Sequence, residues 1–201
     1  MLPCMKKIND IFYSLQGEGR NTGRAAVFIR FAECNLRCPF CDTEFDSYRE
    51  MSDADILDEV SEAWKTVATD GPAGRLLVVL TGGEPTLQVD EAFVDLLHGR
   101  GYEVAMESNG TRPAPANIDW LTVSPKGARL AVSRCNELKV LFSSEESVKD
   151  FGVEADCYYL QPCDTGDVRQ NRVVTSCCVD YVRRHPQWRL SLQTHKLVGF
   201  K

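Results

Sequence analysis

Residues 75–85 read Arg-Leu-Leu-Val-Val-Leu-Thr-Gly-Gly-Glu-Pro, and this stretch decides the fold class. After the arginine, five apolar residues follow one another without alternation, which is typical of a buried strand. The two glycines that come next allow a backbone to approach a ligand closely, because glycine has no Cβ. The stretch therefore predicts a buried strand over residues 75–80 that ends in a tight, glycine-containing turn.

Strands and helices alternate on both sides of this stretch. Apolar runs predict further strands, and apolar residues at helical spacing predict helices. The expected strands cover residues 26–31, 102–106, 120–123, 137–142, 157–162 and 188–193, and the expected helices cover 53–68, 89–100, 144–150 and 168–185. This alternation implies βαβ units and a largely parallel sheet, with the reactive residues at the carboxyl ends of the strands.

The length of the chain limits how far such a sheet can close. A complete eight-fold barrel needs about 250 residues, and this chain has 201. With about six or seven strands and few full helices, we expect an α/β fold: a partial, open (β/α)6-type barrel with shortened helices and mostly parallel strands. No repeat or Pro/Ser-rich linker marks a boundary, so residues 1–201 are expected to form a single domain.

Composition excludes several classes of function. Hydrophobic residues make up 43% and charged residues 26% of the chain, and 23 basic against 29 acidic residues give a net charge of −6. A protein that binds nucleic acid without regard to sequence needs a basic face, so no nucleic-acid partner is expected. No apolar run reaches the roughly 20 residues that span a bilayer, and no signal peptide is recognised. We expect a cytoplasmic protein with no membrane partner.

Nine cysteines are many for this length, and their odd number argues for reduced thiols rather than a disulfide framework. Three of them, Cys34, Cys38 and Cys41, lie within eight residues. Zinc sites usually have four ligands, often in two separated pairs, whereas three close cysteines suit a four-iron cluster with one iron open to another ligand. On spacing alone, three alternatives stay open: an iron–sulfur cluster, a zinc site completed by a distant residue, and a loop of inert buried thiols.

The cysteine spacing resembles the cluster-binding loop of the radical S-adenosylmethionine (SAM) enzymes, and Phe40 matches the aromatic residue that lies near the adenine there. The segment Gly82-Gly83-Glu84-Pro85 resembles their GGEP motif, whose acidic residue receives the ammonium of SAM. The resemblance implies a radical SAM core that holds a [4Fe-4S] cluster on the three cysteines. It also implies SAM contacts from Phe40, Cys41, Asp42, Gly83, Glu84, Glu107, Asn109, Ser124, Pro125, Lys126 and Gln161.

A narrower resemblance, to the 7-carboxy-7-deazaguanine synthase family, runs from about residue 11 to residue 196. It rests on Ser14-Leu15-Gln16-Gly17-Glu18-Gly19, Cys41-Asp42-Thr43 and Gln193-Thr194-His195-Lys196. It implies contraction of 6-carboxy-5,6,7,8-tetrahydropterin to 7-carboxy-7-deazaguanine with loss of ammonia, in 7-deazapurine and queuosine biosynthesis, with SAM regenerated. It further implies a homodimer and an electron donor such as flavodoxin.

The same resemblance implies a Mg²⁺ ligand at Thr43 and a pterin site formed by Leu15, Gln16, Gly17, Glu18, Arg30, Thr81, Gln193, His195 and Lys201. The residue types agree with this. Arg30, on a strand that enters the cysteine loop, presents a planar fork suited to a carboxylate. Gln16 offers both a donor and an acceptor to an amide-like ring edge.

Two rival functions compete with this hypothesis. A radical SAM enzyme that installs a glycyl radical on a protein partner is also short and shares the cysteine loop, but it leaves residues 14–19 and Arg30 without a small-molecule ligand. A non-catalytic zinc or iron–sulfur module leaves the segment Thr81–Pro85 and the grouping of polar residues at strand ends unexplained.

Overall fold

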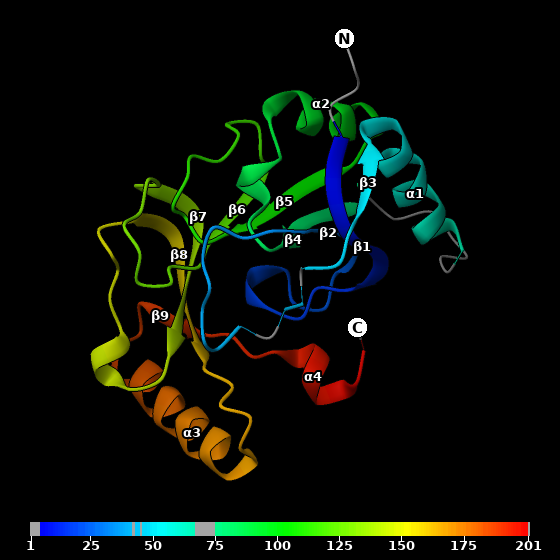
Figure 1. Cartoon of the computed structure of the whole chain (residues 1–201). Coiled ribbons are helices and arrows are strands. Elements are labelled where there is room, and N and C mark those ends of the chain that lie inside the picture. The colour runs from blue at the N-terminus through cyan, green and yellow to red at the C-terminus, as the bar shows by residue number, and fades with distance from the viewer. Residues whose placement is uncertain (1–4, 42, 45, 67–74, 201) are drawn as a thin grey trace.

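The computed structural model describes residues 5–41, 43–44, 46–66 and 75–200. In this part of the chain, strands form one open sheet in the order β3-β1-β2-β4-β5-β6-β7-β8-β9 (Figure 1). From β2 to β9 every neighbouring pair is parallel. The parallel strands are β2 (Ala25–Phe31), β4 (Leu77–Gly82), β5 (Glu103–Ser108), β6 (Trp120–Val123), β7 (Arg134–Phe142), β8 (Glu154–Pro162) and β9 (Trp188–Leu190). The expected α/β fold with an open, mostly parallel sheet is confirmed.

The predicted strand count was too low, because two antiparallel strands were missed. β1 (Met5–Leu15) pairs with β2 on one side and with the short β3 (Arg49–Ser52) on the other. Along β1, Lys6 and Ile8 are buried, and the next buried residue is Ile11 rather than residue 10. The reason is that the register shifts between Ile8 and Asp10. Such a bulge moves the inward face from even to odd positions and destroys the period-two pattern by which strands are recognised.

Four α-helices accompany the sheet, and they are α1 (Asp53–Lys65), α2 (Glu91–Gly99), α3 (Val168–Arg184) and α4 (Thr194–Val198). Side chains of Ser52, Asp90 and Asp167 cap the first three by accepting hydrogen bonds from backbone N–H groups that the helix leaves unpaired. The helix expected over 144–150 is a single 3-10 turn (Glu145–Ser147), and the expected strand over 188–193 ends at Leu190. The end predicted for the first helix, residues 67–68, lies outside the described residues.

The helices α1, α2 and α3 cover one face of the sheet, and the cavity lies on the other face together with α4. Val78 and Leu80 of β4 pack with α1 and α2, whereas Leu77 and Val79 pack on the opposite face with Phe28 and its neighbours. β4 is thus buried on both sides, as its unbroken apolar run predicts. α3 covers the β7–β9 end of the sheet through a separate core that includes Val174.

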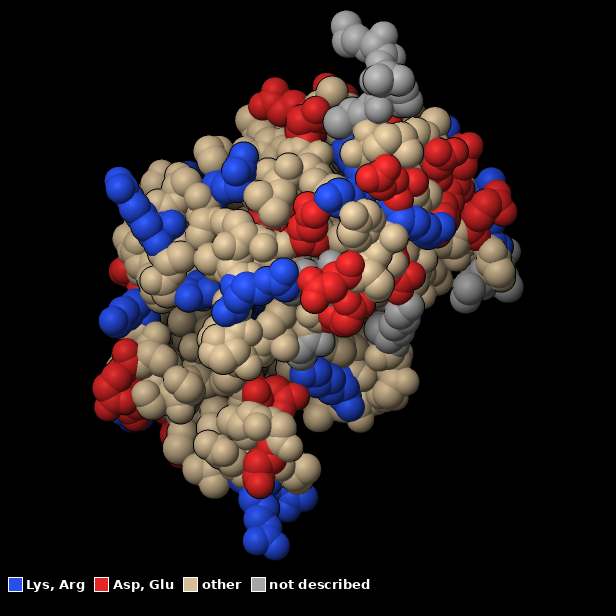
Figure 2. Space-filling model, viewed as in Figure 1, with Lys and Arg blue, Asp and Glu red and all other residues tan. Residues whose placement is uncertain are grey.

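Acidic and basic side chains are interspersed on the face of the molecule shown in Figure 2, with uncharged residues between them. This mixture agrees with the modest net charge of −6. Of the helices that the structure describes, none is long and apolar enough to cross a membrane.

Candidate active site

A cavity of about 420 Å³ opens at the carboxyl ends of the parallel strands. This volume lies in the range of about 300–1,000 Å³ that is usual for sites of small molecules and cofactors. The structure brings nineteen predicted site residues into its wall: Leu15, Gln16, Gly17, Glu18, Arg30, Cys34, Cys38, Phe40, Cys41, Thr43, Thr81, Gly83, Glu107, Asn109, Ser124, Lys126, Gln161, Gln193 and His195. Asp42 and Lys201 lie outside the described residues.

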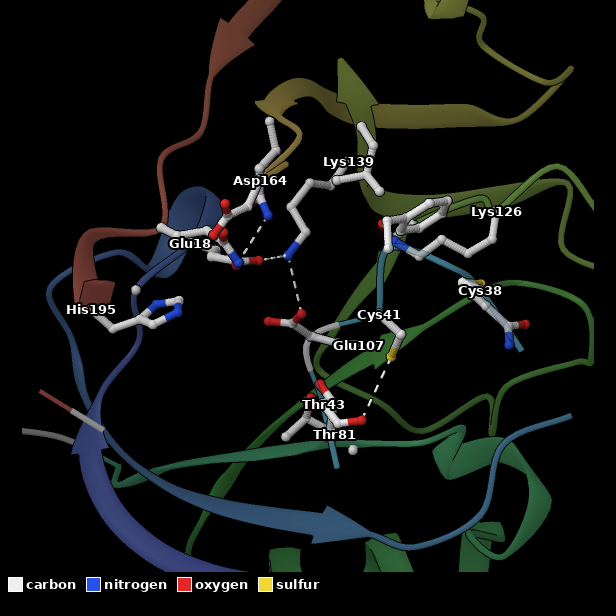
Figure 3. Close-up of a pocket in the computed structure, with 18 of the residues that line it drawn as sticks. Glu18, Cys38, Cys41, Thr43, Thr81, Glu107, Lys126, Lys139, Asp164 and His195 are labelled. Atoms are coloured by element: carbon white, nitrogen blue, oxygen red, sulfur yellow. Dashed lines mark hydrogen bonds and ion pairs between the residues drawn. The ribbon is translucent and has the colours of Figure 1, made fainter. Parts of the chain in front are cut away.

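The three clustered cysteines enter the cavity from the loop that follows β2. All three are free thiols. The backbone N–H of Leu36 donates to Cys34 Sγ at 3.4 Å, and the Cys41 thiol donates to the carbonyl oxygen of Thr43 at 3.7 Å (Figure 3). Three thiols on one short loop match the ligand chemistry of a [4Fe-4S] cluster. In the described part of the chain, however, no three His, Cys, Asp or Glu side chains converge closely enough to hold a metal ion.

The glycine turn after β4 packs directly against the start of the cysteine loop. A Cβ on Gly83 would lie 1.8 Å from the carbonyl oxygen of Glu33. The close approach allows the N–H of Gly83 to donate to the Phe31 carbonyl and the N–H of Glu84 to donate to that of Glu33, both at 2.9 Å. Gly83 is thus required for backbone contact with the cysteine loop, a role that the sequence did not indicate.

Glu84 and Pro125 are the two predicted residues of the described chain that do not line the cavity. Both are buried. Glu84 was expected to receive the ammonium of SAM, but its carboxylate is fully buried beneath the wall and accepts hydrogen bonds from Ser108 Oγ at 2.8 Å and the N–H of Asn109 at 2.7 Å. Glu84 therefore ties the turn after β4 to the end of β5 and fixes Asn109, which does face the cavity.

Lys139, on β7, is a cavity residue that the sequence analysis missed. Its side chain, 4% exposed, forms an ion pair with Glu18 and a second with Glu107 at 3.1 Å (Figure 3). Burial alone would lower the pKa of Lys139, but the two carboxylates outweigh it and raise that pKa. The sequence did carry a signal: Glu137 and Lys139 alternate with Leu138 and Val140, which places two charges on one face of a buried strand.

The loop between β1 and β2 forms the wall beside this lysine. Gln161 and Gln193 each donate from Nε2 to Glu18 Oε1 at 3.0 Å. Burial would raise the pKa of Glu18, but the positive charge of Lys139 outweighs it and lowers that pKa. Gln16 donates from Nε2 to Glu107 Oε1 at 2.8 Å. Amide side chains and one lysine thus bind two carboxylates at the edge of the cavity.

Arg30 lies on the β2 side of the cavity, next to Thr81 in the register of β2 and β4. Its guanidinium carbon lies 5.4 Å from the centroid of the Phe12 ring. Among the described residues, no group accepts a hydrogen bond from its buried Nε atom. A buried donor without a partner is costly unless a ligand supplies the acceptor.

The segment after β9 closes the cavity. The carbonyl of Gly17 accepts hydrogen bonds from the N–H and Oγ1 of Thr194 at 3.1 and 2.9 Å, and the His195 ring packs where a Cβ of Gly17 would lie. Lys196 forms an ion pair of 2.9 Å with Asp164, a cavity residue that the sequence analysis also missed. The hydrogen bond from Lys196 lowers the pKa of Asp164.

Comparison with known proteins identifies the family. A model described as the radical SAM superfamily matches residues 28–133. The 7-carboxy-7-deazaguanine synthase of Bacteroides thetaiotaomicron is 48% identical over 98% of this chain and 100% of its own, and that of Bradyrhizobium diazoefficiens is 42% identical over 96% and 98%. The crystal structure of QueE from Escherichia coli superposes with a TM-score of 0.68, at 27% identity, and covers 94% of this chain and 93% of its own. The chain therefore belongs to the 7-carboxy-7-deazaguanine synthase family of radical SAM enzymes.

Proposed function

We propose that this chain is a 7-carboxy-7-deazaguanine synthase that contracts the ring of 6-carboxy-5,6,7,8-tetrahydropterin and releases ammonia. The observation that carries the proposal is that one cavity contains both the three thiols of a radical SAM loop and a buried guanidinium nitrogen that has no hydrogen-bond partner among the described residues. Relatives with this name align with nearly the whole chain. An arginine inside the cavity favours a small acidic substrate over a protein partner.

Cys34, Cys38 and Cys41 would hold the [4Fe-4S] cluster, and SAM would lie along Phe40, Gly83, Asn109, Ser124, Lys126 and Gln161. When bound, the cluster and SAM supply a 5′-deoxyadenosyl radical that takes a hydrogen atom from the substrate. The residues of the chain bind SAM and the substrate, orient them and enclose them. The segment that carries His195 covers the cavity and limits the access of water, which would quench reactive species.

The substrate would lie between two charged walls. Arg30 would bind the carboxylate as a planar fork and provide its buried Nε with an acceptor. Gln16 and Glu18 would accept from the N–H groups of the pyrimidine edge, and Thr81 would contact the ring beside Gly83. A ligand that is acidic at one end and rich in N–H donors at the other fits this arrangement of charges.

Thr43 would provide an oxygen ligand to Mg²⁺. It lines the cavity close to the cysteine loop. Mg²⁺ prefers oxygen ligands and usually keeps several waters or substrate oxygens, so one protein ligand is sufficient in such a site. We further place the reaction in the cytoplasm of the cell, with a flavodoxin-like electron donor and a homodimeric enzyme, on the strength of the family resemblance.

Anaerobic turnover tests the proposed function. The reconstituted protein receives SAM, Mg²⁺, a strong reductant and 6-carboxytetrahydropterin, and mass spectrometry follows the products. We expect 7-carboxy-7-deazaguanine to accumulate while the SAM concentration stays constant. Release of 5′-deoxyadenosine without this product would contradict the proposed substrate, and an intact cluster that cleaves no SAM would contradict radical chemistry.

Replacing Arg30 with methionine is expected to raise the KM for the pterin about 100-fold, because removal of one partner of a buried charge pair typically costs about 2–5 kcal/mol. Arg30→Lys should restore little of this, since an ammonium lacks the planar fork. The matched control is Arg172→Met, which changes an exposed arginine on α3. Equal KM values for Arg30→Met and wild type would exclude Arg30 as the carboxylate ligand.

A further inference from the structure

Lys139 connects the two carboxylates that face the ligands from different sides. Glu18 belongs to the loop after β1 and is expected to face the substrate, whereas Glu107 ends β5 and is expected to face SAM. Lys139 Nζ contacts both, and Gln16 joins them a second time by donating to Glu107 and accepting from the N–H of Glu18 at 3.1 Å. A change at Lys139 therefore reaches both carboxylates.

The backbone around Glu18 is held in place independently of Lys139. The N–H of Gly19 donates to Ser191 Oγ at 3.0 Å, and the N–H of Arg20 donates to Glu137 Oε2 at 2.9 Å. Gly19 has a φ of +64°, and a Cβ there would lie 2.0 Å from Glu137 Oε1, so only glycine fits. The loop thus keeps its position while Lys139 determines the charge of the Glu18 side chain.

The acceptor capacity of Glu18 is almost fully used. A carboxylate accepts about four hydrogen bonds. Gln161 and Gln193 take both positions on Oε1, and Lys139 takes one on Oε2. One position on Oε2 remains for a ligand in the cavity that Glu18 lines. This position accepts a proton donor only while Glu18 is ionised.

We propose that Lys139 is a positioning residue that holds Glu18 as an ionised acceptor for the exocyclic amine of the substrate and thereby selects a 2-amino pyrimidine ring. The inference rests on the proposed function and deepens it. Without Lys139, Glu18 would keep its burial and lose the positive charge that offsets it, so the pKa of Glu18 would rise. A protonated Glu18 would donate a hydrogen bond at the position that has to accept one. The exocyclic amine of the ligand would then face a second donor and would bind less tightly.

Other ionisable side chains near this pair come from every neighbouring element, and they are Glu137, Lys126 and His195. Burial raises the pKa of Glu137, and burial together with the charge of Lys139 lowers that of Lys126. Loss of the Lys139 charge also acts on Glu137 and Lys126, because that charge lowers the pKa of both. A comparison with variants of Glu18 is therefore needed to assign the effect of Lys139 to that carboxylate.

The test measures equilibrium binding, by calorimetry, of two ligands to the anaerobically reconstituted enzyme with SAM. One is 7-carboxy-7-deazaguanine, and the other is the same bicycle without the 2-amino group, 7-carboxy-7-deazahypoxanthine. Wild type is expected to bind the ligand with the 2-amino group about tenfold or more tightly than the other from pH 6 to pH 8. A site built to accept a hydrogen bond from an amine rejects a ligand that lacks the amine. Lys139→Met should lose this preference at pH 6, to below about threefold, and regain part of it at pH 8 as Glu18 ionises.

Two further variants separate charge from packing. Lys139→Arg keeps the positive charge and should keep the preference, and Lys149→Met, a change at an exposed lysine, should match wild type. If Lys139→Met fails to fold, Glu18→Gln is compared with the double variant Glu18→Gln/Lys139→Met. The double variant has one fewer buried negative charge than Lys139→Met alone. Because Lys139 acts through Glu18, both should show the same weak preference.

Each outcome supports or overturns the inference. A preference that Lys139→Met retains at every pH, or a further loss of preference in the double variant, overturns the role of Lys139 and leaves the proposed function intact. A wild-type enzyme that forms no 7-carboxy-7-deazaguanine in the turnover assay overturns the proposed function itself.

Discussion

Cys38→Ala will bind no complete four-iron cluster and will form no 7-carboxy-7-deazaguanine. A [4Fe-4S] cluster in this superfamily has only three protein ligands, so the loss of one thiolate leaves two irons without protein contact. Iron and acid-labile sulfide are measured after anaerobic reconstitution, together with product formation. Wild type should contain about four irons per chain and the variant far fewer.

The matched control is Cys177→Ala, because Cys177 is an exposed free thiol on α3, away from the cavity wall. We expect this variant to keep wild-type iron content and activity. Iron loss in both variants would mean that iron binding is not specific to the loop of residues 34–41. A Cys38→Ala variant with full iron content and activity would exclude the loop of residues 34–41 as the cluster site.

Gly83→Ala is expected to destabilise the protein by about 3 kcal/mol and to reduce cluster content sharply. The added Cβ would lie 1.8 Å from the carbonyl oxygen and 2.4 Å from the carbonyl carbon of Glu33. Both atoms belong to the backbone, so no side chain can rotate to relieve the contact. The turn and the start of the cysteine loop must separate, which breaks the paired hydrogen bonds from Gly83 and Glu84.

Gly99→Ala serves as the control for this substitution. Gly99 ends α2, and nothing lies within 4 Å of a Cβ placed there. Alanine should be neutral or stabilise the helix by about 0.5–1 kcal/mol. Urea unfolding of both variants without cluster gives the free energies of unfolding, and iron analysis follows reconstitution. Equal stability of Gly83→Ala and wild type would show that the turn and the loop are not in contact.

The strands β2, β4 and β5 were predictable because an apolar run forms the centre of each. β4 is the clearest case, since burial on both faces leaves an unbroken run of five apolar residues. β1 was not predictable by the same means. Its bulge between Ile8 and Asp10 changes which residues face inward, and no local pattern survives such a shift.

The site residues also divide into those that the sequence could predict and those that it could not. Residues in contiguous motifs, such as the cysteine loop and residues 15–18, were placed on the cavity wall by resemblance. Lys139 and Asp164 belong to no such motif, and only the fold brings them to the same cavity. Glu84 is the opposite case: it lies in a motif, yet its carboxylate is buried and bound by Ser108 and Asn109. A motif shows which segment is important but not which way each side chain points.

The bond between Gly17 and Thr194 joins segments 177 residues apart in the sequence. A ribosome therefore releases the thiols of residues 34–41 into the cell long before the wall that encloses them exists. During this interval the cysteines are open to oxygen and to stray metal ions. The wall is complete only after β9 and α4 have been synthesised and Thr194 has packed against the loop after β1.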